Sequence, residues 1–429
     1  MERYEKYKDS GVEWIGEIPE GWAVKKFKYL YALITDKSDL DLPKIGLENI
    51  ESETGKFITS NTDFEGGGIH FKINDILFGK LRPYLAKVYL AEFEGKAIGD
   101  FYVFRCENEI DARYSSNLIL SKPFIDLSNS STFGSKMPRV AWDIIANFKI
   151  AYPSLTEQTT IANYLDHKTT EIDQLITQKE HLLSLYEEEK TAIINQAVTQ
   201  GITPDVKLKE SGIDWLGDIP EHWEVKKLKY IGAIKYGLGQ PPKLNPNGLP
   251  LIRATNVFRG VIDEKNMIFV DPHDVPYDRD PVLKEFDIIV VRSGAYTADS
   301  AIIPKEYEGA ITGYDMVFRT NQANCPDFIS FILLSNYVLN NQLIPLSLRA
   351  AQPHLNKEEL GETLVHIPPL SEQITIARHI KTELTRINTK ITKTKKIITL
   401  QKEYRTALIS EVVTGKIKVT NLDYKEIIL

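Results

Sequence analysis

The chain has 429 residues, of which 42% are hydrophobic and 26% charged, and its formal net charge is −7. This length indicates two or three globular domains. It contains no apolar run of about 18 residues, no apolar leader and only two cysteines, Cys106 and Cys325. We therefore expect a cytoplasmic protein without a membrane span or disulfide framework. Nucleic-acid binders usually carry a net positive charge. Any DNA contact of this chain must therefore rest on local basic clusters or on basic surface that a partner supplies.

The first recognisable segment, residues 10–31, returns later in the chain. It reads SGVEWIGEIPEGWAVKKFKYLY, and residues 211–232 read SGIDWLGDIPEHWEVKKLKYIG. Agreement at this density indicates an internal duplication. The tryptophans Trp14, Trp22, Trp215 and Trp223 lie in the most similar part of the two halves. We therefore interpret them as core or partner-facing anchors and not as base-stacking residues.

The middles of the two halves, residues 33–150 and 234–365, have diverged strongly. Both mix apolar, strand-like runs, at 76–78 and at 288–291, with Gly/Pro-rich turns, which predicts mixed α/β domains. In each middle an apolar strand opens into a basic, aromatic loop, whose predicted DNA contacts are Lys80, Arg82 and Tyr84 in the first copy and Arg292, Ser293 and Tyr296 in the second. Arg and Lys bond guanine edges or phosphates, and Tyr bonds phosphate, so we favour DNA contact over a solvated strand end.

A second polar, proline-containing loop lies further along each middle. Its candidate DNA-binding residues are Lys136 and Arg139 in the first copy and Arg349, Gln352, His354, Asn356 and Lys357 in the second. The amides of Gln352 and Asn356 suit adenine, and the basic side chains suit guanine or phosphate. For any single residue, a surface connector is an equal alternative.

Two weaker candidates complete the middles. Asn49 and Asn256 align between the copies, and either base reading or a structural turn fits them. Residues 236–240 have no counterpart in the first copy and suggest a mobile reading loop.

Each half closes with a joint motif, PSLTEQTTIA at 153–162 and PPLSEQITIA at 368–377. About 45 residues without Pro or Gly follow, which predicts two long helices, 155–199 and 370–414. Apolar residues recur at seven-residue spacing in both, so we expect the helices to pair antiparallel, with the globular units at opposite ends of a rod. Lys179, Thr394 and Gln401 interrupt this seam. The alternative is two helices that pack only on the globular parts.

Motifs for chemistry are missing. The sequence has no GxxxxGK[ST], GxSxG or HExxH, no closely spaced Cys/His set for zinc and no Asn/Asp-Pro-Pro-aromatic tetrad. A loose nuclease template joins Pro204-Asp205 to Glu224-Val225-Lys226, but Glu224 corresponds to Ala23 in the first copy. We expect no catalytic residue, no metal site and no cofactor on this chain.

Taken together, the paired SGxxWxGxIPExW segments, the joint motifs and the two helices resemble the specificity subunit of type I restriction–modification systems. The resemblance covers essentially the whole chain. It implies an α+β fold with two target-recognition domains, 1–152 and 203–367, separated by two long antiparallel helices within 153–202 and 368–429. It also implies a non-catalytic subunit that recognises a bipartite DNA target.

The resemblance further implies partners: adenine-methylating modification subunits, two of them, and restriction subunits. These partners, and not this chain, use S-adenosylmethionine, ATP and magnesium. Because the two middles differ, we expect a non-palindromic target, whereas a homodimeric reader imposes a palindrome. Two alternatives stay open, a duplicated protein-binding scaffold without DNA contact and a stand-alone DNA-modifying enzyme.

Overall fold

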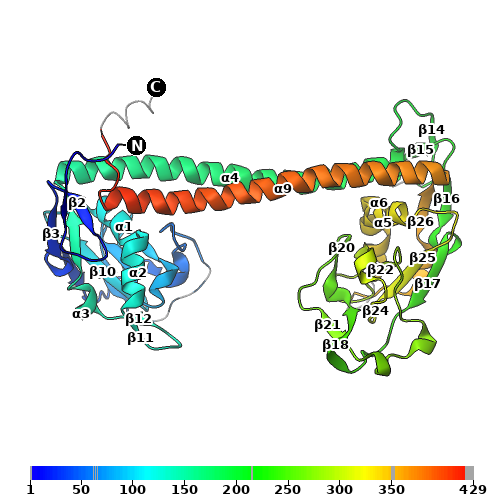
Figure 1. The fold of residues 1–429 in the computed structure, drawn as a ribbon, viewed down its shortest axis with the longest axis horizontal. Coiled ribbons are helices and arrows are strands. Elements are labelled where there is room, and N and C mark those ends of the chain that lie inside the picture. The colour runs from blue at the N-terminus through cyan, green and yellow to red at the C-terminus, as the bar shows by residue number, and fades with distance from the viewer. Residues whose placement is uncertain are drawn as a thin grey trace. The chain divides into compact units, whose positions relative to one another are not determined.

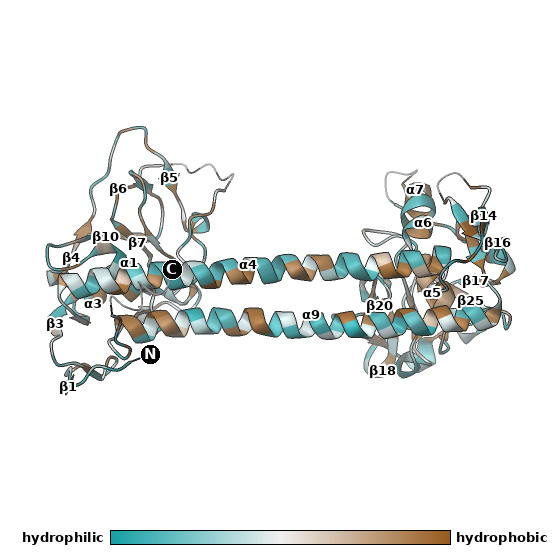
Figure 2. Cartoon of the chain, turned by 90° about the horizontal axis from the view of Figure 1, so that it is seen from above, coloured by the Kyte–Doolittle hydropathy of each residue, from teal (hydrophilic) through white to brown (hydrophobic). Residues whose placement is uncertain are grey.

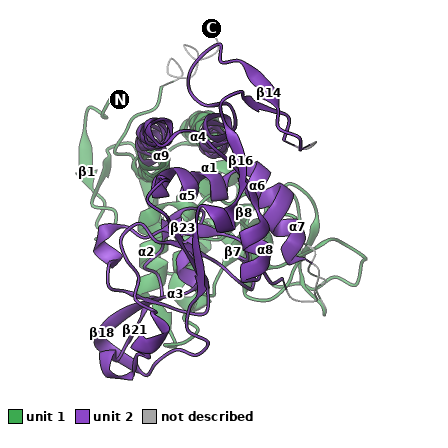
Figure 3. Cartoon of the chain, turned by 90° about the vertical axis from the view of Figure 1, so that its right-hand side faces the viewer, with its two compact units in different colours: residues 1–180, 395–429 green, residues 181–394 purple. Residues whose placement is uncertain are grey.

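The computed structural model describes residues 2–60, 62, 64, 66–213, 216–348 and 353–420. Figure 1 shows its α+β fold, and Figure 3 colours its two compact units. Unit 1 comprises 1–180 and 395–429, and unit 2 comprises 181–394. Each unit combines a mixed α/β domain with one stretch of each long helix.

The domain of unit 1 is built on a four-stranded antiparallel sheet in the order β4-β10-β7-β8. Its strands are β4 (Tyr31–Ile34), β7 (Ile76–Gly79), β8 (Val88–Leu90) and β10 (Phe101–Cys106). The apolar run predicted as a strand at residues 76–78 is β7, and it is fully buried.

Smaller elements surround this sheet. The paired strands are β1 (Tyr7–Asp9) with β2 (Glu17–Pro19), β3 (Ala23–Lys26) with β13 (Lys149–Tyr152), β11 (Thr132–Phe133) with β12 (Arg139–Val140), and the sheet of β5 (Lys44–Ile45), β9 (Gly95–Ala97) and β6 (Ile69–Phe71). The short helices are η1 (Phe27–Tyr29), η2 (Leu47–Asn49), η3 (Pro83–Leu85), α1 (Ala112–Leu120), α2 (Lys122–Ser130) and α3 (Trp142–Ile145).

The domain of unit 2 repeats the same plan. Its four-stranded sheet has the order β17-β25-β22-β23, the same sequence-order pattern as in unit 1. The strands are β17 (Gly232–Tyr236), β22 (Ile288–Val290), β23 (Ser300–Ile302) and β25 (Met316–Thr320). The duplication read from the sequence is therefore present in the topology.

Smaller elements surround the sheet of unit 2 as well. The remaining strands are β14 (Leu208–Glu210), β15 (Asp218–Pro220), β16 (Glu224–Lys227), β18 (Leu244–Ile252), β19 (Val257–Phe258), β20 (Val261–Ile262), β21 (Ile268–Val270), β24 (Ile311–Thr312) and β26 (Leu364–Ile367). The short helices are η4 (Leu228–Tyr230), η5 (Ala254–Asn256), η6 (Pro272–Asp274), η7 (Tyr277–Arg279), η8 (Lys305–Tyr307), α5 (Pro326–Leu334), α6 (Asn336–Val338), η9 (Leu339–Leu343), α7 (Ile344–Ser347) and α8 (Lys357–Glu362). The nine-residue strand β18 is the clearest addition, because β5 has two residues.

The two predicted long helices are α4 (Leu155–Gln200) and α9 (Leu370–Val413). In unit 1, Arg405 pairs with Asp173 and Lys402 with Glu180. In unit 2, Arg386 pairs with Glu189, and the Lys390 ammonium lies over the Tyr186 ring. Residue numbers rise along α4 while those of the α9 partners fall, so the helices pair antiparallel in both units, as predicted.

Apolar and polar positions alternate along both helices (Figure 2). The buried apolar positions include Ile172 and Ile176 of α4 and Ile387 and Ile391 of α9. Thr394 is also buried, so one of the predicted polar interruptions lies inside the seam. Among the described residues, no helix has both the length and the apolar character that a membrane crossing requires.

The joint motifs explain why the ends of the two halves stayed similar. The Trp22 indole donates to Glu157 at 3.2 Å, and the Trp223 indole donates to Glu372 at 3.1 Å. Both tryptophans are buried, which confirms their interpretation as anchors; Trp14 is half-buried, and Trp215 lies outside the described residues. The first turn of each long helix is thus fixed to the start of its own domain.

Candidate nucleic-acid interface

In unit 1, the two candidate loops of the sequence meet at one end of the four-stranded sheet. The backbone of Leu81 forms a β-bridge with Arg139. The Arg82 amide donates to the Pro138 carbonyl at 2.8 Å, and the Val140 amide donates to the Lys80 carbonyl at 3.2 Å. The loop after β7 and the turn between β11 and β12 therefore form one surface.

Unit 2 brings its two loops together in the same way. The backbone of Ser293 forms a β-bridge with His354. The Leu355 amide donates to the Arg292 carbonyl at 2.8 Å, and the Thr297 hydroxyl donates to the Pro353 carbonyl at 3.4 Å. Sequence reasoning named these segments separately, whereas the fold joins them in both units.

The loop of unit 1 presents basic and aromatic side chains. Arg82 is exposed and has left-handed backbone torsions (φ 50°), a strained state that its two backbone hydrogen bonds hold. No other described residue bonds its guanidinium. Tyr84 is half exposed, and Lys136 is exposed. The Lys80 ammonium lies 5.1 Å from the centre of the Tyr102 ring, within cation–π range.

Arg139 is held within the protein. Its guanidinium bonds both carboxylate oxygens of Asp100, at 3.0 and 2.9 Å. This hydrogen bonding raises the pKa of Arg139. The pair braces the turn beside Lys80, so a direct DNA contact by Arg139 requires this fork to open or to share its donors.

The corresponding loop of unit 2 is organised around Arg292. Its guanidinium carbon lies 4.3 Å from the Tyr236 ring centre and 4.6 Å from that of Tyr314. The Arg292 amide donates to the carboxylate of Asp315 at 3.1 Å. Asp315 is buried, and burial raises its pKa to about 6. The Tyr236 hydroxyl accepts the Lys357 amide at 2.9 Å, which attaches the second loop to the same cluster.

The remaining predicted residues of unit 2 differ in their availability. Tyr296 is 44% exposed and meets Phe258 edge to face, Lys357 is exposed, and His354 is half-buried. Arg349 and Gln352 lie outside the described residues. Ser293 contributes its backbone to the bridge with His354.

Asn356 is a helix cap. Its side-chain oxygen accepts the Glu359 amide at 2.8 Å, and the Glu359 carboxylate accepts the Asn356 amide at 2.9 Å, so the two residues form a capping box at the start of α8. The cap holds the Asn356 side chain at the start of α8. A bidentate contact with adenine would require its oxygen to accept a second hydrogen bond, which the two lone pairs of an amide oxygen allow.

The weaker candidates are structural. Asn49 and Asn256 are buried, and their side-chain oxygens accept the amides of Gly46 and Arg253. A turn role is therefore the correct interpretation of both asparagines. At the start of the segment 236–240, Tyr236 ends β17 and the Gly237 amide donates to the Asp315 carbonyl at 2.8 Å, so these two residues are tied to the sheet; the mobile reading loop stays a prediction.

Sequence reasoning missed the residues that position the basic side chains. Tyr102, Asp100 and Tyr314 come from strands or strand ends outside the candidate loops, and their only sequence signal is proximity to a β-strand end. The loose nuclease template gains nothing from the fold, since Glu224 pairs with Lys226 at 2.7 Å. The described part of the chain holds no group of three or more His, Cys, Asp or Glu placed for a metal.

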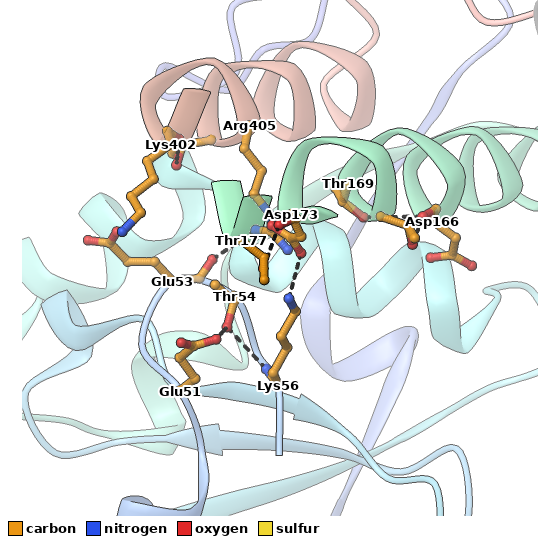
Figure 4. A network of polar contacts seen from close by, with 12 residues as sticks. Glu51, Glu53, Thr54, Lys56, Asp166, Thr169, Asp173, Thr177, Lys402 and Arg405 are labelled. Atoms are coloured by element: carbon orange, nitrogen blue, oxygen red, sulfur yellow. Dashed lines mark hydrogen bonds and ion pairs between the residues drawn. The ribbon is translucent and has the colours of Figure 1, made fainter. Parts of the chain in front are cut away.

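The domain of unit 1 is attached to both long helices by a polar network (Figure 4). The Arg405 guanidinium donates to Asp173 at 3.1 Å and to the Glu53 carbonyl at 3.2 Å. Lys56 adds a second ion pair to Asp173 at 2.9 Å. When the joint motifs at 153–162 and 368–377 are aligned, Asp173 corresponds to Asn388 and Arg405 to Lys190. Unit 2 therefore does not repeat this ion pair.

A duplicated scaffold that carries two dissimilar polar loop clusters defines a two-site recognition protein. The family model for the type I restriction modification DNA specificity domain matches residues 20–184 and 220–402. These matches span most of the sequence, so the chain belongs to this family.

Individual relatives agree with the family match. The chain is 26% identical over 357 residues to the type I restriction enzyme MjaVIII specificity subunit of Methanocaldococcus jannaschii, covering 82% of this chain and 78% of the relative. It is 24% identical to the EcoKI specificity subunit of Escherichia coli, over 85% and 82% of the two chains.

Solved structures share the fold. A chain from a structural study of complex assembly and conformational transition in the type I R-M system has a TM-score of 0.74 at 14% identity, covering 93% of this chain and 99% of that one. The HsdS subunit of Thermoanaerobacter tengcongensis has a TM-score of 0.55 at 16% identity, with 93% and 98% covered.

Proposed function

We propose that this chain is the DNA sequence-specificity subunit of a type I restriction–modification complex, reading a bipartite target and carrying no catalytic site of its own. The observation that supports this most is the same two-loop surface built twice on a duplicated scaffold with different side chains. Similar parts hold the fold, and dissimilar parts face a ligand whose two halves differ.

The two loop surfaces differ in the groups that they offer. Unit 1 has exposed Arg82 and Lys136 and a lysine within cation–π range of one ring, and unit 2 has Arg292 within that range of two rings. Because these donor sets differ in geometry, the half-sites should differ, and the full target should be non-palindromic. The exposed members of the proposed interface are Arg82, Tyr84, Lys136, Tyr296 and Lys357, and Lys80 and Arg292 are half-buried.

Two modification subunits are the partners that the scaffold suggests. In unit 1, α9 and α2 border a groove of about 1290 Å³ that includes Ala407 and Ser410. In unit 2, a smaller groove of about 390 Å³ includes Ala192 and Asn195, which stand at the repeat-equivalent positions of α4.

The grooves share a backbone detail as well as a location. Ser410 accepts the Lys122 amide at 3.2 Å, and Asn195 accepts the Asn336 amide at 2.7 Å. Equivalent surfaces in the two units suit two copies of one partner. We propose that modification subunits occupy them and that restriction subunits join the assembly.

The chemistry of the complex then belongs to the partners, which use S-adenosylmethionine, ATP and magnesium in the cytoplasm. The net charge of −7 favours the same division of labour, because an acidic chain gains little from phosphate neutralisation. Modification subunits that clamp the duplex would supply the missing phosphate contacts. The chain alone should bind DNA weakly, and its affinity should rise on assembly.

The decisive experiment is methylome sequencing of cells that express this chain together with its modification subunit. We expect adenine methylation at one motif with two different half-sites and a fixed, unspecified spacer. The double variant Arg82→Ala, Arg292→Ala should lower methylation or relax the motif, whereas Arg279→Ala, at an exposed arginine of η7, should leave it unchanged. An unaltered motif and methylated fraction in the double variant would favour a protein-binding scaffold instead.

A second assay addresses the enzyme alternative. The purified chain, incubated with DNA, Mg²⁺, ATP and S-adenosylmethionine, should neither cleave nor methylate the DNA. Turnover by the chain alone would overturn the proposed role.

A further inference from the structure

Arg292 differs from the other arginines at the sheets in its partners. Arg105, Arg139 and Arg319 each fork onto a carboxylate, Asp75, Asp100 and Asp287 respectively. Among the described residues, the Arg292 side chain bonds no carboxylate, and the rings of Tyr236 and Tyr314 lie against its guanidinium. The described part of the protein thus positions the guanidinium without occupying its donors.

We propose that Arg292 reads a guanine of the second half-site through its two terminal amino groups, and that Tyr236 and Tyr314 are positioning residues for it. This inference rests on the proposed function and names the base that one residue of the interface recognises. The part of the ligand concerned is the major-groove edge of a G·C pair.

Two ring contacts position the guanidinium. The ring centres of Tyr236 and Tyr314 lie 4.3 and 4.6 Å from the guanidinium carbon and limit the directions from which a ligand can reach it. The Nε atom is buried and has no hydrogen-bond partner in the described part of the chain. The outward donors are therefore the two Nη groups, and such a planar fork matches the O6 and N7 acceptors of guanine.

A neighbouring acid favours a base over a phosphate. Asp315 is buried directly beneath the loop and accepts the Arg292 amide at 3.1 Å. A carboxylate close to the loop disfavours a phosphate more than the uncharged edge of a base. A phosphate contact also has no need for a guanidinium held by two rings, because a phosphate accepts hydrogen bonds from many directions.

Unit 1 has a different arrangement of side chains at the same end of its sheet. Its loop carries Lys80, a point charge over a single ring at 5.1 Å, and the nearby Asp100 is occupied by Arg139. Lysine lacks the planar fork, so the two units should not read their bases in the same way. A change at Arg292 should therefore alter the second half-site and leave the first one intact.

The test compares methylomes of cells that express the modification subunit with the wild-type chain, Arg292→Ala, Arg292→Lys, Tyr314→Leu or Tyr314→Phe. In Arg292→Ala, one G·C position of the second half-site should lose its preference by about tenfold, as expected for one bidentate contact. Arg292→Lys should show most of the same loss. Tyr314→Leu should relax the same position partly, and Tyr314→Phe should restore it because stacking needs only the ring. Arg279→Ala is the charge-matched control in the same unit.

The outcomes separate this inference from the function on which it rests. Unchanged base preferences with a uniformly lower methylated fraction in Arg292→Ala would identify a phosphate contact and overturn the guanine assignment. A second half-site without any G·C requirement would overturn it too. A wild-type chain that directs no bipartite motif would instead refute the proposed function. Retention of the first half-site shows that each variant is folded, and Arg292→Lys decides the matter where Arg292→Ala gives no methylation.

Discussion

His366 is a buried titratable side chain that takes no part in the proposed interface. It lies on β26, fully buried, with its ring stacked on Tyr337 at 4.5 Å between centroids and tilted against Trp223 at 6.3 Å. Neither ring nitrogen has a hydrogen-bond partner in the described part of the chain. Burial lowers the pKa of His366 to about 4, so the ring is neutral in the folded protein at neutral pH.

This histidine should make unit 2 sensitive to acid. Above its ordinary pKa of 6.5, His366 is neutral in both folded and unfolded states. As the pH falls toward 4, only the unfolded state takes up the proton, so the free energy of unfolding drops by up to about 3 kcal/mol. His366→Phe keeps the stacking and removes the titration. We expect urea unfolding followed by tryptophan fluorescence to show a flatter stability profile between pH 6.5 and 4 in this variant.

The matched control is His379→Gln, at an exposed histidine of α9 in the same unit. It should keep the wild-type acid profile. Equal pH profiles for the wild type and His366→Phe would mean that the buried ring does not titrate differently on unfolding.

At this scale, the sequence predicts the chemistry of a side chain better than its partners. The sequence allowed three DNA contacts to be proposed, Lys80, Arg82 and Tyr84, because a basic, aromatic loop after an apolar strand can be recognised in it. The engagement of Arg139 by Asp100 was not visible, since the partner stands 39 residues away. The cap made by Asn356 was accessible in principle, because Glu359 follows three residues later as in a capping box.

At the start of each long helix, a glutamine of the joint motif makes several buried polar contacts. Buried Gln373 accepts the Cys325 amide at 2.8 Å and donates to Asn324 and to the Pro368 carbonyl. Gln158 makes matching contacts in unit 1 with the Asp111 amide and the Pro153 carbonyl. Each glutamine therefore links the first turn of a long helix to the start of α1 or α5.

Replacing Gln373 by Leu should leave buried backbone groups without partners. We expect a loss of about 2–4 kcal/mol in the free energy of unfolding of unit 2, because each buried unsatisfied group costs about 1–3 kcal/mol. Gln196→Leu, at an exposed position of α4 in unit 2, is the control and should change stability by less than about 0.5 kcal/mol. A Gln373→Leu chain as stable as the wild type in urea would show that the motif is kept for another reason.

The ion-pair network of unit 1 offers a second test on elements. Arg405→Met should remove the bonds to Asp173 and to the Glu53 carbonyl, leaving Asp173 with Lys56 alone. We expect unit 1 to lose about 2 kcal/mol, since the half-buried Asp173 carboxylate retains one of its two partners. Lys190→Met, at the equivalent position of unit 2, should cost little because Lys190 pairs only with Glu187 on the helix surface. Similar losses for the two variants in urea titrations would contradict this account.

Elements were predictable where a pattern was long and locally encoded. The helices α4 and α9 end within one residue of the expected bounds, because about 45 residues without Pro or Gly leave few alternatives. Of the short strands, the apolar runs at 76–78 and 288–291 were predicted. Most others were not, since runs of two to four residues are fixed by distant partners such as β13 for β3.

For the whole molecule, the repeat was the informative signal. Two copies of one segment predicted two similar domains, and the sheets of the two units do have the same strand order. The divergence of the middles predicted where they would differ, and β18 and the loop clusters lie there. The base preferences were beyond sequence reasoning, because they depend on how Tyr236 and Tyr314 fold around Arg292.

The paired helices lead to a prediction about the spacer between the half-sites. Inserting seven residues after Glu180 and seven after Thr394 preserves the seven-residue seam of α4 and α9. At 1.5 Å per residue the pair becomes about 10 Å longer, which equals the rise of about three base pairs. We expect the methylated motif to keep both half-sites and to gain about three base pairs of spacer. Three base pairs also rotate the duplex by about 100°, so the methylated fraction should fall below that of the wild type.

The matched control places the seven residues after Glu180 only. Without a partner, the inserted turns disturb the antiparallel register, and methylation should decrease at every spacer length. A doubly inserted chain that still methylates the wild-type spacer would show that something other than the helix pair sets the distance. A lengthened spacer would show that the helices measure it, and in that case the similar ends of the two halves serve to hold this length constant while the middles diverge.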